Sequence, residues 1–278
     1  MRIKLLLWLV IPVVLLLLVT NYITNSRAEE ITLNKTFPEY TDVANKRDML
    51  EKIRENLTKS FNWRGGGAVT FWFDDAWMSQ YTQGFSLMAK HGFKGALAVP
   101  TDLVKYEGYM EWWQIQRLQY NGWEIDSHSV SHECETQNLV GGKLEEELRY
   151  SKTEIMSRGV LADIYVAPCG EVNPELIELA KTYYKALRVS EPGLNDIPVL
   201  DRYFIKANVM LNTTTIEEVD SLVAEAKLTR KWLVLMFHQI DNSQDTYAVT
   251  PQMLEDIIES VKTAKIQVVL PLQMLSLK

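Results

Sequence analysis

The sequence contains few residues of the kinds that specialised proteins use in quantity. Its 278 residues include two cysteines and four histidines, and the 29 lysines and arginines are outnumbered by 36 aspartates and glutamates. The formal net charge is −7 and no basic cluster occurs, which argues against nucleic acid as a partner. There is no internal repeat, low-complexity tract or heptad pattern, and no Gly-x-Ser-x-Gly motif of a serine hydrolase. With 47% apolar residues, the chain can form one large domain with a substantial core.

A long apolar run occurs once, at the amino terminus. Two basic residues precede uninterrupted apolar sequence from Leu5 to Val19, and the next charged residue is Arg27. This pattern predicts that residues 1–28 are a signal peptide, cleaved after Ala28, or a membrane anchor that is retained. Either alternative places the rest of the chain outside the cytoplasm, secreted or attached to the membrane.

Residues 29–66 are mostly polar. They include a helical pattern over residues 42–58 and end in Arg64–Gly67, a glycine-rich connection to the first apolar segment. We interpret them as a polar helical linker and expect the catalytic domain at residues 67–278.

In residues 67–278, strand-like apolar segments alternate with helical patterns. Strands are expected at residues 68–73, 95–99, 123–127, 162–167, 186–189, 203–209, 232–237 and 266–270. Helices are expected at residues 79–90, 111–120, 144–157, 174–184, 216–227 and 251–265. Such alternation indicates a parallel sheet covered by helices. The number of repeats favours a closed or nearly closed α/β barrel of about seven parallel strands over an open doubly wound sheet.

An aspartate pair and a histidine pair follow two of the expected strands. Because residues four apart lie on one face of a helical turn, His128 and His132 can direct two imidazoles at one metal ion, and a carboxylate can supply a third ligand. Three protein ligands leave a coordination position open, as in catalytic metal sites. Asp74 and Asp75 would then provide one ligand and one general base, so the pattern predicts metal-assisted hydrolysis.

The positions of the histidines favour this interpretation. Three of the four, His128, His132 and His238, follow strand-like segments, where a barrel places its active-site loops. The fourth, His91, precedes Gly92 at the end of a helical pattern and is expected to be structural. The alternative is that the aspartate pair caps a helix and that the histidine pair lies on an exposed turn.

The two cysteines, Cys134 and Cys169, each lie beside one of the proposed active-site segments. In an oxidising compartment a disulfide could connect the two loops. Two free, partly buried thiols are the interpretation that we favour from the sequence.

Taken in order, these segments resemble the polysaccharide deacetylases, or carbohydrate esterase family 4, over residues 68–278. An aromatic residue followed by two aspartates matches Phe73–Asp75, and His-Ser/Thr-x-x-His matches His128–His132. A segment ending in Pro-Tyr-Gly is similar to Pro168–Gly170, and Leu-x-x-His matches Leu235–His238. The resemblance implies a distorted (β/α) barrel with one metal-dependent active site.

The resemblance also implies a role for each matched residue. Asp74 is the expected general base, and His238 is the expected general acid that protonates the leaving amine. The backbone N–H of Cys169, after Pro168, is expected to stabilise the oxyanion. The expected metal ligands are Asp75, His128 and His132. This ligand set suits one divalent metal, for which zinc is our prediction and cobalt, nickel and iron are alternatives.

Some positions depart from the family pattern. Trp72 replaces a small hydroxyl residue, Ala76 replaces a common glycine, and Val166 replaces the arginine that orients the base. Trp72 shares the alternating face of Asp74, which makes it the tryptophan best placed to stack on a sugar ring, with core packing as the alternative.

The segment after the fifth expected strand offers replacements for the missing cation. Arg202 or Lys206 could pair with the base, and Asp201 could orient His238. The alternative is that these charges are solvated residues beside a strand.

The sequence therefore predicts an extracytoplasmic, metal-dependent hydrolase that removes N-acetyl groups from an N-acetylglucosamine-containing polysaccharide of the cell surface or the extracellular space. One alternative is an inactive carbohydrate-binding module on the same scaffold, since fold alone does not establish activity. Another is a metal hydrolase of O-acetyl esters or small amides.

Overall fold

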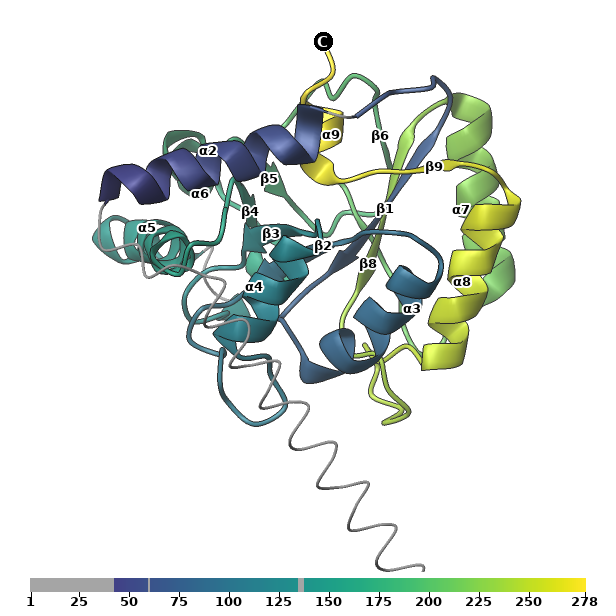
Figure 1. The fold of residues 1–278 in the computed structure, drawn as a ribbon, viewed down its shortest axis with the longest axis horizontal. Coiled ribbons are helices and arrows are strands. Elements are labelled where there is room, and N and C mark those ends of the chain that lie inside the picture. Colours follow the sequence, from purple (N-terminus) through teal and green to yellow (C-terminus); the bar gives the residue numbers. More distant parts are fainter. Residues whose placement is uncertain (1–42, 60, 135–137) are drawn as a thin grey trace, which may run out of the picture. The chain divides into compact units, whose positions relative to one another are not determined.

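A nine-stranded sheet is the centre of the fold in the computed structural model, which describes residues 43–59, 61–134 and 138–278 (Figure 1). The expected signal peptide or anchor, residues 1–28, lies outside the described residues. Within them, no helix has the length and apolar character needed to span a membrane.

The strand order is β5-β4-β3-β2-β1-β8-β6, with β7 paired to β8 and β9 paired to β1. The strands are β1 (Ala68–Phe73), β2 (Ala96–Val99), β3 (Glu124–Ser127), β4 (Ile164–Val166), β5 (Ala186–Arg188), β6 (Leu194–Asn195), β7 (Asn208–Val209), β8 (Trp232–Phe237) and β9 (Gln267–Val268). Every pairing is parallel except that of β6 with β8. The sheet forms a half-barrel, so the expected (β/α) barrel class is confirmed. Strand β6 was not predicted, because two residues are too few to show alternation.

Helices connect most of the strands (Figure 1). The α-helices are α2 (Val43–Lys59), α3 (Phe85–Lys90), α4 (Trp112–Tyr120), α5 (Gly142–Ser157), α6 (Pro174–Tyr183), α7 (Ile216–Thr229), α8 (Pro251–Thr263) and α9 (Pro271–Leu275). A π-helix, η1 (Gln80–Gly84), precedes α3, and a 3₁₀ turn, η3 (Pro168–Gly170), follows β4. Threonine N-caps define the first residues of two helices. The side chains of Thr215 and Thr250 accept hydrogen bonds from the backbone N–H of the third residue of α7 and α8, respectively.

Both faces of the sheet are buried, as expected for parallel strands with continuous apolar sequence. The residues of β1 that point to opposite faces belong to different core clusters. Phe71 and Phe73 pack in a cluster that includes residues of α3, α4, α7 and α8. Trp72 packs on the other face with residues of α2 and α9. Asp74 comes next on that second alternating face, so the chain continues from a buried aromatic residue directly into the expected base.

Helix α2 differs from the expected linker. Its Leu50 and Leu57 are buried in the core cluster of the Trp72 face, and Ile53 packs against the same cluster. These residues are three and four positions apart, so one stripe of the helix is apolar although its composition is polar. Arg54 adds two hydrogen bonds of 2.5 and 2.8 Å to Asp163. The helix is therefore packed on the domain and is not a connecting segment.

Candidate metal centre and active site

The residues expected to act in catalysis lie at the same edge of the sheet. Asp74 and Asp75 follow β1, His128 follows β3, and His238 follows β8. Strands β3, β2, β1 and β8 are consecutive in the sheet and mutually parallel. Their carboxyl ends therefore meet at one edge, which is where barrel enzymes carry their active sites.

The histidine pair lies on a loop and not on the helical turn that the spacing suggested. Ser129 and His132 have positive φ angles of 65° and 57°. Ser129 Oγ accepts a hydrogen bond of 3.0 Å from the backbone N–H of His132, and Glu147 of α5 accepts bonds from the next two backbone N–H groups after Ser129. These bonds give the loop its shape. The prediction that both imidazoles converge is confirmed, but its helical basis was wrong.

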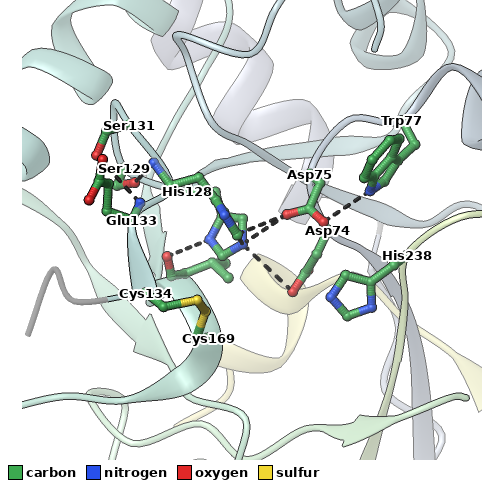
Figure 2. Close-up of polar contacts among 12 residues, drawn as sticks. Asp74, Asp75, Trp77, His128, Ser129, Ser131, Glu133, Cys134, Cys169 and His238 are labelled. Carbon is green, nitrogen blue, oxygen red and sulfur yellow. Dashed lines mark hydrogen bonds and ion pairs between the residues drawn. A yellow bond between two sulfur atoms is a disulfide. The ribbon is translucent and has the colours of Figure 1, made fainter. Parts of the chain in front are cut away.

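Three side chains form a candidate metal centre, shown in Figure 2. The Oδ1 atom of Asp75 lies 3.0 Å from Nε2 of His132 and 3.4 Å from Nε2 of His128, and the two Nε2 atoms are 3.1 Å apart. Nδ1 of His128 donates to the backbone carbonyl of Val166 at 2.8 Å, which leaves the Nε2 lone pair directed at the centre. Oδ1 of Asp75 is buried without a hydrogen-bond partner in the described part of the chain. Two imidazole nitrogens and one carboxylate oxygen in this arrangement fit a divalent metal ion.

The charges at this centre favour a cation. Burial acts to raise the pKa of Asp75, but the adjacent imidazoles of His128 and His132 outweigh it, so the pKa lies well below the usual value for aspartate. For His132, burial acts to lower the pKa and the adjacent Asp75 carboxylate outweighs it, which raises the pKa. Asp75 is therefore an anion at neutral pH and available as a metal ligand.

Asp74 and His238 lie beside the centre on neighbouring loops (Figure 2). Asp74 is 2% exposed, and its Oδ2 is 4.0 Å from Nε2 of His128. The side-chain amide of Gln80 donates to the backbone carbonyls of both Asp74 and His238, at 2.5 and 2.8 Å, and so holds the two loops together. Burial lowers the pKa of His238. The arrangement places a carboxylate and an imidazole next to the candidate metal centre, an arrangement that can serve general acid–base chemistry.

The cation that pairs with Asp74 is Arg188, which the sequence analysis did not identify. Arg188 is fully buried at the end of β5 and forms an ion pair with Oδ2 of Asp74. The two expected candidates lie elsewhere: Arg202 is exposed, and Lys206 pairs with Glu191 at 2.8 Å. An arginine inside an apolar strand was the missed signal, because a buried guanidinium requires a partner.

Three further expectations are corrected. Asp201 is exposed and accepts a hydrogen bond of 2.9 Å from the backbone N–H of Tyr203, which gives it a turn-forming role and no part in orienting His238. Trp72 is fully buried, with the guanidinium of Arg188 5.4 Å from its ring, so the ring is core and not a sugar platform. Pro168 is buried as well and offers no surface to a substrate.

The two cysteines form a disulfide, contrary to our preference for free thiols. Cys134 lies after the histidine loop and Cys169 lies in η3, with Cα atoms 5.3 Å apart. The bond connects the loop that carries His132 to the turn whose backbone was expected to face the oxyanion. The sequence could not decide this pairing, because it depends on the distance between two loops that are separate in the chain.

Ala76 shows why a glycine is common at its position. Its φ is +58°, in the left-handed region that glycine occupies without steric cost. Asp75, directly before it, has a φ of +78°. The chain therefore turns sharply after β1, and the two consecutive aspartates have different partners: Asp74 pairs with Arg188, and Asp75 faces the two imidazoles.

Comparison with known proteins finds similarity in sequence and in fold. Residues 62–185 match the family model described as polysaccharide deacetylase. No functionally curated protein matches the chain at a significant level. Among solved structures, the fold resembles that of the Xyl-CE4 domain of a multidomain xylanase from the hindgut metagenome of Trinervitermes trinervoides. That pair has a TM-score of 0.54 and 18% identity, over 75% of this chain and 89% of the other.

Two other solved structures have a similar fold. The Streptococcus pyogenes deacetylase PplD, in complex with acetate, has a TM-score of 0.51 and 16% identity over 63% of this chain and 83% of its own. A mutant of a CE4 family pseudoenzyme with restored enzymatic activity has a TM-score of 0.51 and 17% identity over 76% of this chain and 68% of its own. The chain is therefore similar to the polysaccharide deacetylases in the sequence of residues 62–185 and, over the described domain, in its fold.

Proposed function

We propose that this protein is a metal-dependent deacetylase that hydrolyses N-acetyl groups of an N-acetylglucosamine-containing polysaccharide. The observation that carries the proposal is the convergence of Asp75, His128 and His132 beside Asp74 and His238. Zinc is the metal that we assign, because two imidazoles and one carboxylate in a three-ligand set are typical of catalytic zinc sites.

Each residue has a separate task in the proposed reaction. Asp75, His128 and His132 would hold a divalent metal, which would supply Lewis-acid polarisation and lower the pKa of water. The carboxylate of Asp74 accepts the proton of the attacking water, and the imidazole of His238 donates a proton to the departing nitrogen. The backbone N–H of Cys169 donates to the oxyanion.

We place the reaction outside the cytoplasm, in a secreted or membrane-anchored protein. The apolar amino terminus behind two basic residues supports this location. The disulfide between Cys134 and Cys169 supports it independently, since disulfides persist in oxidising compartments.

The test is acetate release from N-acetylglucosamine oligomers by the full-length chain, first stripped of metal and then reloaded with zinc. Asp74→Asn is the matched variant, because it keeps the size of the side chain and removes the base. We expect release that depends on zinc and is lost in the variant. Zinc binding without release by the wild type would contradict the proposed activity.

The same assay separates the alternatives. O-acetylated oligomers offered in parallel distinguish an esterase from an amidase, because only the amide needs a protonated nitrogen leaving group. One protein of similar fold is a mutant of a CE4 family pseudoenzyme, so an inactive protein on this scaffold is a real alternative to test. Retention on an immobilised glycan, with no acetate from either substrate, would favour that alternative.

A further inference from the structure

Trp77, which follows the aspartate pair by two positions, makes a contact that the mechanism above does not use. Its indole Nε1–H donates a hydrogen bond of 3.0 Å to Oδ2 of Asp75. The other carboxylate oxygen, Oδ1, is the atom that faces the two imidazoles. Figure 2 shows the Asp75 carboxylate between the imidazoles and the indole. The two oxygens of Asp75 therefore have separate partners.

The indole is held in place on its other side. The ring of Tyr109 stacks on that of Trp77, with centroids 4.3 Å apart and an interplanar angle of 25°. The backbones of the two residues form an isolated antiparallel bridge. Hydrogen bonds on both sides of it, from Met110 N to Ala76 O at 2.8 Å and from Met78 N to Gly108 O at 2.7 Å, fix this segment to the loop before α4.

The charge of the Asp75 carboxylate also acts on the hydroxyl group of Tyr109. Burial raises the pKa of the Tyr109 hydroxyl, and the Asp75 carboxylate raises it further. Both aromatic side chains are half-buried, so the hydrogen bond of Trp77 is partly protected from water. A donor in such an environment restrains a carboxylate more strongly than one in open solvent.

We propose that Trp77 is a positioning residue for the metal ligand Asp75. Its N–H occupies Oδ2 and leaves Oδ1 as the single oxygen directed at the metal, and Tyr109 holds the indole in the required orientation. Loss of a hydrogen bond between a metal-ligating side chain and a neighbouring residue commonly lowers metal affinity by about 10–100-fold. This inference rests on the proposed function only in requiring that the site bind a divalent metal.

The experiment measures the zinc dissociation constant of the full-length chain by competition with a chelator. Trp77→Phe keeps an aromatic ring for stacking and removes the donor, and we expect zinc binding about 10–100-fold weaker. Tyr109→Phe is the matched control, since it keeps the stack and removes only a hydroxyl, and we expect wild-type affinity. Equal affinity in wild type and Trp77→Phe would overturn the role of Trp77.

Two further measurements separate positioning from a general loss of structure. Thermal unfolding of the metal-free chains is expected to be similar for wild type and Trp77→Phe, while the visible spectrum of the cobalt-loaded variant changes because Asp75 is free to rotate. Tyr109→Ala removes the support and keeps the donor, so it should weaken zinc binding even if Trp77→Phe does not fold. Wild-type affinity in Tyr109→Ala would then overturn the proposal.

Failure of this inference and failure of the proposed function give different results. A wild type that binds zinc and releases no acetate contradicts the deacetylase activity alone, and the comparison of zinc affinities still decides the role of Trp77. A wild type that binds no divalent metal overturns both.

Discussion

The guanidinium of Arg188 forms a buried ion pair with the carboxylate of Asp74, 114 positions earlier in the chain. Arg188 is aligned with Val166 on the adjacent strand β4, the position at which related sequences were expected to carry the arginine. Residues aligned in this way point to the same face of the sheet, about 4.8 Å apart. The cation therefore lies one strand away from the expected position and still reaches Asp74.

We predict that Arg188→Val removes most of the activity and destabilises the fold. Asp74 would remain buried without its partner, and breaking a buried ion pair costs about 3–5 kcal/mol. The double variant Val166→Arg, Arg188→Val returns an arginine to the same face and should recover part of both losses. Urea unfolding and acetate release measure the two effects on the same preparations.

The single variant Val166→Arg is the control for this exchange. It adds a second buried cation beside Arg188, so we expect it to be less stable than the double variant. The backbone carbonyl of Val166 that accepts from His128 is kept in all three variants. A double variant no more active or stable than Arg188→Val would show that the position of the guanidinium on β5 is essential.

A second prediction concerns His238. Replacement by Gln should lower kcat by about 10²–10⁴-fold, because the departing nitrogen loses its proton donor. Zinc affinity should stay the same, since His238 is not among the three ligands. The loss should be larger for an N-acetyl than for an O-acetyl substrate, and kinetics on both substrates test this. Equal losses would argue that His238 has a role other than protonating nitrogen.

The positions of the expected catalytic residues could be predicted from the sequence because each lies directly after a strand with a strong apolar pattern. Asp74 follows β1 and His238 follows β8, and the observed bounds of both strands agree with those predicted. Once the strands are parallel neighbours, their ends have to meet. This part of the site needs only local pattern and topology.

The supporting residues could not be predicted in this way, because their roles depend on tertiary distances. The sequence can mark Arg188 as a buried cation, but its partner Asp74 is identified only when β5 is placed in the sheet, and the disulfide only when two loops are placed together. Trp72 was assigned to the substrate because alternation gives the face of a residue and not the depth at which it is buried. The alternating side-chain pattern of a strand therefore cannot show whether a residue lies in the buried core or at the edge of the sheet that a substrate can reach.

A third prediction concerns the disulfide between Cys134 and Cys169. The bond closes a loop of 35 residues, for which the chain-entropy model gives about 4 kcal/mol of stability. Cys134→Ser with Cys169→Ser should lose stability of this order and bind zinc more weakly, because the loop of His132 is no longer fixed. Thermal unfolding and zinc competition, with and without a reductant, provide the measurement. Wild-type zinc affinity in the double variant would show that the hydrogen bonds to Ser129 and Glu147 fix the loop without the disulfide.

The last prediction concerns the ion pair between Arg54 of α2 and Asp163, whose carboxylate also lies 3.1 Å from Nζ of Lys185. Burial acts to raise the pKa of Asp163, but the hydrogen bond and charge of Arg54, with the charge of Lys185, outweigh it, so the pKa lies below its usual value. A carboxyl group whose pKa is lowered by folding stabilises the folded state above its unfolded pKa of about 3.9. That contribution is lost as the pH falls through the lower pKa of the folded state.

Arg54→Met should therefore destabilise the protein by about 1.5–3 kcal/mol at neutral pH, the value of a hydrogen bond between charged groups. The difference from wild type should shrink as the pH falls below about 4 toward the lowered pKa of Asp163 in the folded wild type, because the carboxylate is then progressively protonated and loses its charge. Urea unfolding of both proteins at steps from about pH 7 to about pH 3 measures this difference in the free energy of unfolding. Lys46→Met is a control on the same helix, since Lys46 bonds to a backbone carbonyl, that of Ser157, and its effect should not depend on pH in this range. A constant difference for Arg54→Met across the range would mean that α2 is held by Leu50 and Leu57 and not by the ion pair.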